Sequence, residues 1–209
     1  MGRGISFNRE AATEEAMRQF WKSGYTGTSL RDLLKATGLG EGSFYNTLKS
    51  KKQLYVDCLR HYGATEGEKR AAALISAPDT ATGLRAMFDA VLDCLDDPAT
   101  PSRVCMLAAM VSEDVFADEE LRAFARTSSA QFHDQLRARL AQDRERGLVR
   151  VDLDPALTAS LVLTYAQGLW RMALIDYDRA RFVREIDAFL TALGLTRKAR
   201  RRSLAHPRQ

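Results

Sequence analysis

The chain has 209 residues, of which 45% are hydrophobic and 28% charged, with only 5 prolines and 13 glycines. This composition is typical of a folded globular chain and excludes a low-complexity or collagen-like protein. No apolar run reaches the roughly 18 to 20 residues that a membrane helix needs, and the N-terminus lacks the apolar core of a signal peptide. We therefore expect a cytoplasmic protein. The 3 cysteines have no CxxC spacing, so we expect no disulfide framework, no metal site and no cofactor.

Charge is distributed unevenly along the chain. Residues 1–70 carry 12 Lys and Arg against 8 Asp and Glu, residues 71–194 carry 13 against 19, and residues 195–209 carry 6 against 0. A basic front, an acidic middle and a basic tail indicate an anionic partner at one end of the chain. The tail is expected to be disordered and solvated over residues 196–209, with non-specific attraction to DNA as the alternative.

Helix signals dominate the first 70 residues. Asn8 is a suitable N-cap for the first helix, and Gly24 is a suitable end. Thr28 is expected to cap the second helix, with Asp32 in its first turn, and Ser50 to cap the fourth. The expected bounds of these four helices are residues 9–23, 29–37, 41–48 and 51–74.

Helical periodicity continues through the rest of the chain, and no segment shows the alternation typical of a strand. Residues 102–116 are apolar on most sides, which predicts one buried helix. Asp154 and Pro155 are suited to the cap and the first position of a later helix. The other expected helices are residues 80–96, 119–147, 155–176 and 180–193. The predicted fold class is therefore all-α, with about nine helices.

The segment TGLGEGSFYNTLKSK, residues 37–51, is open to three interpretations. A nucleotide-binding glycine loop needs a preceding strand or the spacing G-x-x-x-x-G-K-[ST], and the segment has neither. A plain turn between two helices fits these residues. A helix-turn-helix also fits: it would turn Phe44 and Leu48 inward and small or polar residues outward, where a helix N-terminus favours DNA phosphates.

A longer segment, GYTGTSLRDLLKATGLGEGSFYNTLKSKKQLY, closely resembles the DNA-binding domain of the tetracycline-repressor-like (TetR) family. The resemblance covers about residues 8–65. Leu34 and Thr37 stand where alanines are usual, and Thr47 and Leu48 replace a common aromatic pair. The positions that match the family pattern in order and spacing are Gly24, Tyr25, Thr28, Ser29, Leu30, Leu33, Gly38, Leu39, Gly42, Tyr45, Lys51 and Leu54.

The resemblance implies a homodimeric repressor that is released from a near-palindromic DNA operator by a small-molecule effector. Thr28 and Arg31 would contact the DNA backbone, as would Tyr45 and Lys51, and Gly42 would allow a close approach. The implied base-reading residues are Glu41, Ser43 and Asn46. A solvated carboxylate at a helix start explains Glu41 equally well.

The resemblance also implies a helix-turn-helix domain over residues 1–50, a linking helix over 51–74, and a ligand-binding and dimerisation domain over 75–195. The last two helices would pair with their copies through Phe182, Ile186 and Leu190, a stripe that also fits a plain core. Aromatic, Met and Cys side chains could line a pocket for an apolar or aromatic effector, or could be core. These residues are Phe88, Cys105, Met106, Met110, Phe132, Tyr165 and Trp170. Arg171 could meet an acidic effector or lie at the surface.

Two other kinds of regulator and an enzyme are alternatives to a repressor released by an effector. Cys105 resembles a cysteine of some electrophile-sensing family members, and Arg103 beside it could favour the thiolate, which suggests a thiol-based sensor. A DNA-binding protein without an effector is the second rival. An enzyme is disfavoured, because His61, His133 and His206 lack metal-like spacing and no nucleophile has an adjacent catalytic signature.

Overall fold

The computed structural model describes residues 8–195, and within this range the chain forms helices and turns with no strand. The all-α prediction is confirmed. The basic tail predicted over residues 196–209 lies outside the described residues. The elements are α1 (Arg9–Gly27), α2 (Leu30–Thr37), α3 (Glu41–Leu48), α4 (Lys51–Tyr62), the π-helical segment η1 (Gly63–Gly67), α5 (Glu68–Ile75), α6 (Thr80–Asp96), α7 (Met106–Ala109), α8 (Glu113–Phe116), α9 (Glu119–Glu145), α10 (Pro155–Ile175) and α11 (Arg179–Ala192).

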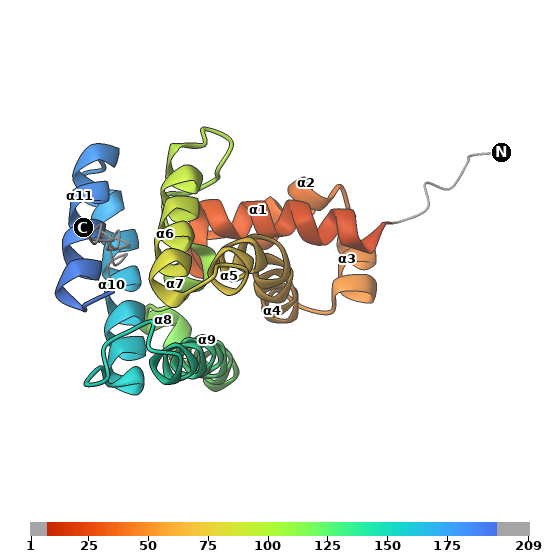
Figure 1. Ribbon diagram of the computed structural model, residues 1–209. Coiled ribbons are helices and arrows are strands. Elements are labelled where there is room, and N and C mark those ends of the chain that lie inside the picture. The colour runs from red at the N-terminus through yellow and green to blue at the C-terminus, as the bar shows by residue number, and fades with distance from the viewer. Residues whose placement is uncertain (1–7, 196–209) are drawn as a thin grey trace, which may run out of the picture.

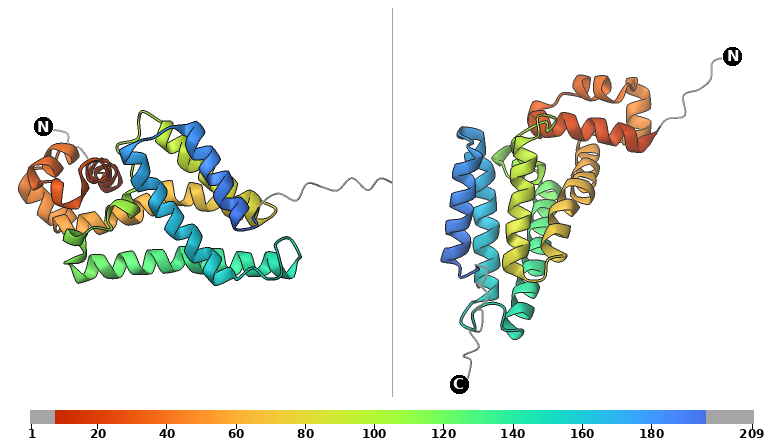
Figure 2. Two further views of the ribbon diagram at one scale, coloured as in Figure 1. Left: turned by 90° about the vertical axis from the view of Figure 1, so that its left-hand side faces the viewer. Right: turned by 45° about the horizontal axis from the view of Figure 1, so that its top comes forward.

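The helices are arranged in layers between two ends of the molecule. Figure 1 places α1, α2 and α3 at one end, which we call the head (residues 9–50), and α10 with α11 as the outer layer at the opposite end. Between them stands α6. The left view of Figure 2 shows the long helix α9 running alongside the rod made of α4, η1 and α5. In the described part of the chain, no helix is both long and apolar enough to cross a membrane.

Most predicted helix starts are confirmed by their caps. The side chains of Asn8, Ser50 and Asp154 each accept a hydrogen bond from a backbone N–H of the helix that follows. The prediction that Thr28 caps α2 is wrong. Ser29 is the N-cap: its hydroxyl accepts from the backbone N–H of Asp32, whose carboxylate accepts from the backbone N–H of Ser29.

Two predicted helices differ in detail from the structure. The single buried helix expected over residues 102–116 is wrong, because Ser112 is extended (φ −142°, ψ 155°) and splits the segment into the four-residue helices α7 and α8. The long helix expected over 51–74 is present, but its middle widens into η1. If α4, η1 and α5 are counted as one rod, and α7 and α8 as one segment, residues 8–195 contain nine helical units, which is the number expected.

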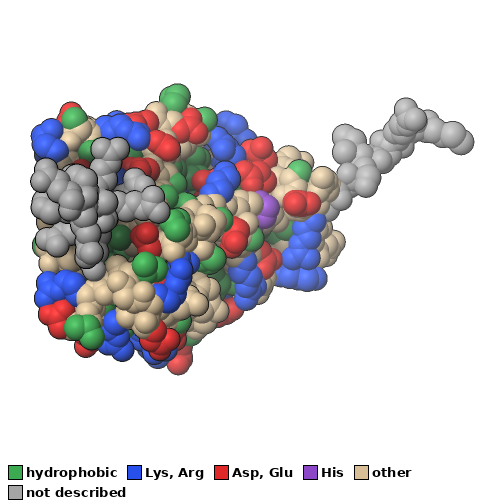
Figure 3. All heavy atoms as spheres, viewed as in Figure 1, with side chains coloured by type: hydrophobic (Ala, Val, Ile, Leu, Met, Phe, Trp, Pro, Cys, Tyr) green, Lys and Arg blue, Asp and Glu red, His purple; other side chains and the backbone are tan. Residues whose placement is uncertain are grey.

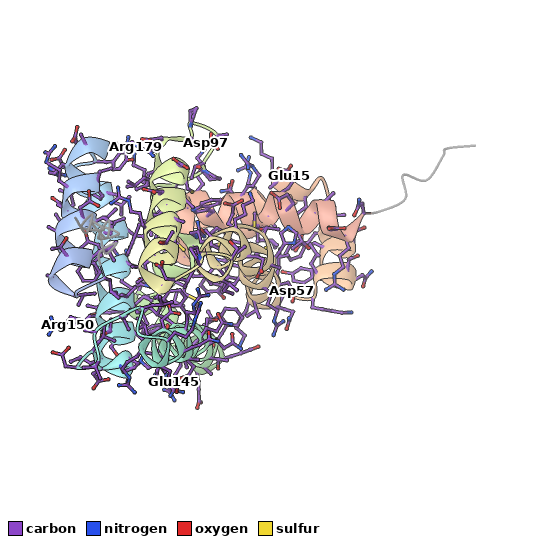
Figure 4. The ribbon with its side chains drawn as sticks, viewed as in Figure 1. Glu15, Asp57, Asp97, Glu145, Arg150 and Arg179 are labelled. Atoms are coloured by element: carbon purple, nitrogen blue, oxygen red, sulfur yellow. The ribbon has the colours of Figure 1, made fainter. Side chains whose placement is uncertain are left out.

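Side-chain contacts from distant parts of the sequence join the layers. The carboxylate of Asp143 on α9 is fully buried and accepts from the backbone N–H (2.6 Å) and hydroxyl (2.7 Å) of Thr80, at the start of α6. Arg179, labelled at the upper end of α11 in Figure 4, donates to Asp93 (2.8 Å) and to Asp96 on α6. These bonds attach both α9 and α11 to α6, so α6 is the central support of the body.

The packing of α5 against α6 depends on Gly83. A Cβ atom at Gly83 would lie 2.5 Å from the carbonyl oxygen of Leu74 and 3.1 Å from its Cα. Both atoms belong to the backbone of α5, so the two helices can approach this closely only where one residue lacks a side chain.

Replacing Gly83 with alanine should force α5 and α6 apart and lower the free energy of unfolding by about 1–3 kcal/mol. Gly63→Ala is the matched control, because Gly63 has helical angles (φ −61°, ψ −43°) and nothing within 4 Å of its virtual Cβ. Urea denaturation followed by circular dichroism measures both variants. Equal stability of the two would contradict the importance of this close approach.

Candidate nucleic-acid interface

A small aromatic core fixes the head. The rings of Phe20 and Tyr55 meet edge-on with centroids 4.9 Å apart, and Tyr25 lies 4.8 Å from Tyr55. On α3, Phe44 and Leu48 are buried, as the helix-turn-helix interpretation predicts. Because these two side chains are four residues apart, they fix one face of α3 against the core and leave the other face outward.

The outward face of α2 and α3 presents most of the predicted DNA-contacting residues. Tyr45 is 47% exposed, with its ring edge-on to Phe44 at 5.5 Å. A Cβ at Gly42 would meet nothing within 4 Å, so this face is open at its thinnest point. No side chain among residues 8–195 caps α3, which leaves its first N–H groups free of a side-chain acceptor. The predicted residues that are exposed are Arg31, Glu41, Gly42, Ser43, Tyr45 and Asn46.

Thr28 and Lys51 are placed differently from the expectation. Thr28 is completely buried, and its hydroxyl donates to the carbonyl oxygen of Gly24 (2.7 Å), so its side chain is not presented to DNA. Gly24 itself has a left-handed φ of 73°, which turns the chain at the predicted helix end. Lys51 is half-buried, with its Nζ 4.6 Å from the Tyr25 ring centroid, and burial lowers the pKa of its ammonium group.

The sequence interpretation did not single out Lys49 as a DNA contact. Lys49 is exposed directly after α3, in a left-handed conformation (φ 66°), and its Nζ donates to the carbonyl oxygen of Asn46 (3.1 Å). Because Lys49 directly follows the predicted helix over residues 41–48, its position in the sequence already indicated a cation beside the outer face of that helix. With Arg31 and Lys35 it adds exposed cations to the head, where basic side chains are visible at the right of Figure 3.

An ion-pair cluster joins the head end of α4 to the start of α9. The Nζ of Lys52 lies 3.1 Å from carboxylate oxygens of both Asp118 and Glu120. The pKa of the Lys52 ammonium group is raised, mainly by its hydrogen bond to Glu120 and next by its hydrogen bond to Asp118. Asp118 also caps α9 by accepting from backbone N–H groups. The body therefore contacts α4 one residue away from Lys51.

A second connection runs through the interior, and we call it the seam (Trp21, Tyr62, Arg70 and Trp170). The indole N–H of Trp21 donates to the carbonyl oxygen of Val104 (2.7 Å), and its ring meets Tyr62 edge-on at 4.9 Å. The hydroxyl of Tyr62 accepts from Arg70 (2.8 Å). The guanidinium carbon of Arg70 lies 5.7 Å from the Trp170 ring centroid. The seam thus joins α1, α4, α5 and α10.

A cavity of about 180 Å³ lies beside the seam, between α5, α6, α7, α9 and α10. The predicted residues that line it are Cys105, Met110, Phe132 and Trp170. The prediction is wrong for Phe88, Met106 and Tyr165: Phe88 and Met106 are buried core, and Tyr165 stacks on Phe189 at 3.9 Å. The cavity adjoins an open groove of about 740 Å³ between α8, α9 and α10, and the residues common to both are Val111, Ala125, Ser129, Leu163 and Gln167.

The cavity wall also holds polar groups that the sequence did not place there. Arg70 and Gln167 both line it. Arg171, considered as a partner for an acidic effector, lines the open groove beside the cavity and donates to the carbonyl oxygens of Ala108 (2.9 Å) and Val111 (3.0 Å). The carbonyl oxygen of Ala108 also accepts from the backbone N–H of Val111 (3.3 Å), and Arg171 adds a side-chain donor at the break between α7 and α8.

Cys105 is 8% exposed and lines the cavity. Arg103, expected to favour its thiolate, lies over the Tyr177 ring at 5.5 Å instead. The polar neighbour of Cys105 is Tyr62, whose pKa is raised by burial and further by Cys105, while Arg70 acts in the opposite direction. Among residues 8–195, no group of three His, Cys, Asp or Glu side chains is placed to hold a metal ion.

The prediction that Phe182, Ile186 and Leu190 form a dimer interface is wrong. All three are buried inside the protomer. Helical periodicity showed that they share one face of α11, but it could not show whether that face meets the same chain or another copy. The exposed apolar side chains of the outer layer lie on α10 instead, at Leu157, Leu161, Met172, Leu174 and Ile175.

Comparison with known proteins places this fold among DNA-binding regulators. Residues 12–58 match the family described as "Bacterial regulatory proteins, tetR family", and residues 81–189 match "Tetracyclin repressor-like, C-terminal domain". The uncharacterized HTH-type transcriptional regulator YezE of Bacillus subtilis (strain 168) is 28% identical over 197 residues, covering 92% of this chain and 100% of that protein. The HTH-type transcriptional repressor ComR of Escherichia coli (strain K12) is 33% identical over 107 residues, covering 51% of each chain.

A solved structure with the same fold contains DNA. It is a cysteine mutant of the TetR family transcriptional regulator CifR complexed with 26-base-pair double-strand operator DNA. The TM-score is 0.82 at 26% sequence identity, covering 91% of this chain and 99% of that chain.

Proposed function

The chain belongs to the tetR family of bacterial regulatory proteins, and from this premise we propose that it is a homodimeric repressor released from its operator by a small molecule bound in the cavity. The observation that carries the proposal is the open outer face of α3, which is fixed from behind by buried Phe44 and Leu48. The DNA-bound CifR structure and the repressor name of ComR support it.

In the proposed complex, α3 enters the major groove of DNA. Tyr45 and Lys49 would contact phosphates that border the groove, because Tyr45 is exposed on α3 and Lys49 is exposed directly after it. Ser43 and Asn46 would face base edges, and an Asn amide pairs well with adenine. Exposed Glu41 has no ion pair within the described residues, and near phosphates its carboxylate would disfavour binding unless it accepts from a cytosine amino group.

Three successive parts of the chain have separate proposed roles. Residues 1–50 would bind DNA, the rod over 51–74 would transmit changes, and residues 75–195 would hold the effector and the dimer contact. The rod suits this role because Lys51 at its first turn contacts the Tyr25 ring and Arg70 near its end lines the cavity. A shift of the rod would therefore move the head relative to the cavity.

The proposed dimer interface is the outer face of α10 together with that of α11. Leu157 and Leu161 lie one turn apart near the start of α10, and Met172 and Ile175 continue the exposed apolar face towards its end. Pairing this face with its copy would bury it in a four-helix arrangement. A fixed dimer would hold the two heads at the spacing of successive major grooves, about 34–36 Å.

Release would follow from a difference in effector affinity between two arrangements of the heads. An effector shifts the population only if it binds the non-matching arrangement more tightly. The seam offers a physical route, because Tyr62 contacts both Trp21 of the head and Arg70 of the cavity wall. A ligand that moves Arg70 would thereby alter the contact that holds α1 against α4.

A thiol-based sensor is the second candidate, and the placement of Cys105 in the cavity wall favours it. Covalent addition of an electrophile there would place new atoms against Tyr62 and Trp170. The thiolate sulfur would form the new bond to carbon, and the adduct would take a proton from water. This candidate shares the release route of the seam but requires no reversible effector.

Replacing Tyr45 with alanine should weaken binding to a labelled DNA duplex at least tenfold, because a phosphate contact is lost while the exposed side chain contributes little to folding. Lys49→Ala should lower the slope of log affinity against log salt by about 1. Fluorescence anisotropy at several salt concentrations measures both effects. Lys69→Ala, which removes an exposed lysine of α5 far from the outer face of α3, is the control and should change neither. Wild-type affinity in both head variants would refute the proposed DNA face.

Replacing Leu161 with glutamate should convert the dimer to a monomer, because the interface would have to bury two carboxylates without partners. Analytical ultracentrifugation gives the mass directly. Leu148→Glu is the matched control, since both leucines are 41% exposed and Leu148 lies in the loop after α9. A Leu161→Glu protein that stays dimeric would place the interface elsewhere.

If Cys105 is a sensor, N-ethylmaleimide should release wild-type protein from DNA and leave Cys105→Ser bound. Cys94→Ser is the control, because Cys94 is the more exposed cysteine outside the cavity wall and should behave as wild type. Mass spectrometry confirms which thiol is modified. Equal release of the Cys105→Ser protein would eliminate the thiol-based mechanism.

A further inference from the structure

The cavity combines an apolar wall with a single charged group. Of the described residues that line it, Arg70 alone carries a formal charge, and Gln167 and Ser128 add polar groups. Aromatic and sulfur-containing side chains, among them Trp170 and Phe132, supply much of the remaining wall. A guanidinium in such surroundings is desolvated, so its interactions are stronger than they would be in water.

Arg70 has few partners within the protein. It donates one hydrogen bond, to the Tyr62 hydroxyl at 2.8 Å, and lies over the Tyr62 ring at 5.4 Å and the Trp170 ring at 5.7 Å. Among the side chains that the structure describes, none of the carboxylates forms an ion pair with it. The nearby Glu66 pairs with Lys69 instead. A guanidinium has five N–H donors, so most of its donors are left for a ligand or water.

The size of the cavity limits what can bind there. An apolar protein cavity of about 150 Å³ is large enough for benzene, and this one measures about 180 Å³ and continues into the open groove. A ligand of that size has a body of one ring or a short alkyl chain. The group best matched to a desolvated guanidinium is a carboxylate, which can accept two parallel N–H bonds.

We propose that the cavity selects a small amphipathic carboxylate, with its carboxylate on Arg70 and its apolar body against Trp170 and Phe132. The proposal rests on the proposed function in treating this cavity as the effector site, and it gives the effector a chemical class. It adds an anionic group to the apolar or aromatic effector expected from the sequence, and it assigns that group to Arg70 rather than to Arg171.

Isothermal titration calorimetry of the full-length protein tests the proposal with three acids and their amides: benzoate and benzamide, phenylacetate and phenylacetamide, hexanoate and hexanamide. At least one acid should bind at least tenfold more tightly than its amide. Arg70→Met should abolish this preference and leave amide binding within a few-fold. Arg70→Lys should retain part of the preference for the acid. This variant also replaces Arg70→Met in the comparison if Arg70→Met does not fold. Arg126→Met, an exposed arginine of the groove, should keep the preference in full.

Three outcomes would overturn the proposal: amides that bind as tightly as acids, acids that do not bind the wild-type protein, or an acid preference that survives Arg70→Met. Binding of DNA by the same proteins without additive is measured in parallel. If the wild-type protein does not bind DNA, the repressor function is refuted but the ligand class is not. If the wild-type protein binds DNA and shows no preference for acids over amides, only the ligand class is refuted.

Discussion

The hydrogen bond from Arg70 to Tyr62 is the contact on which the arrangement of head, cavity and outer layer depends. Tyr62 is fully buried at the end of α4, where its ring forms a T-shaped pair with the ring of Trp21 and its hydroxyl accepts from Arg70 at 2.8 Å. Eight residues of regular α-helix turn by roughly 800°, which would leave Arg70 roughly 80° away from the Tyr62 face. The wider turns of η1 rotate less per residue and bring the guanidinium back towards Tyr62.

This geometry gives the π-helical segment a function. Such segments carry a cost in regular hydrogen bonding and often occur at functional sites. Here, Gly67 of η1 lines the cavity directly, and Arg70 follows one turn later. The rod therefore reaches from the Tyr25 ring beside Lys51 to the cavity without leaving helical structure. In the proposed mechanism, a ligand bonded to the remaining N–H groups of Arg70 would act on the packing of the head by moving the guanidinium that donates to Tyr62.

The head could be predicted from sequence because its determinants are local. Turn glycines, caps and the four-residue spacing of Phe44 and Leu48 all act within a short stretch of chain, and they fixed the bounds of α3 correctly. The exception, Ser29 rather than Thr28 as the cap of α2, arose because both residues can cap a helix. Only the burial of Thr28 under the turn at Gly24 separates them.

The body was less predictable because its determinants are long-range. A periodic stripe on α11 identifies an apolar face, yet only the fold shows that Phe182 packs inside its own protomer. Likewise, no local pattern distinguishes Arg70 from the other charged residues of its helix, and only the fold shows that it lies over the Trp170 ring. Four of the seven proposed pocket residues line the cavity. The other three are also aromatic or Met residues, and they pack in the core or against another ring, which residue type alone does not predict.

The most direct measurement of the central claim is selection of bound sequences from a pool of random double-stranded DNA by the full-length protein. A dimeric repressor should enrich two inverted half-sites whose centres lie about 10 base pairs, or a multiple of that distance, apart. This outcome requires both an α3 that reads bases and a dimer that fixes the spacing of two heads. Recovery of a single unrepeated site, or of no preferred sequence at all, would contradict it.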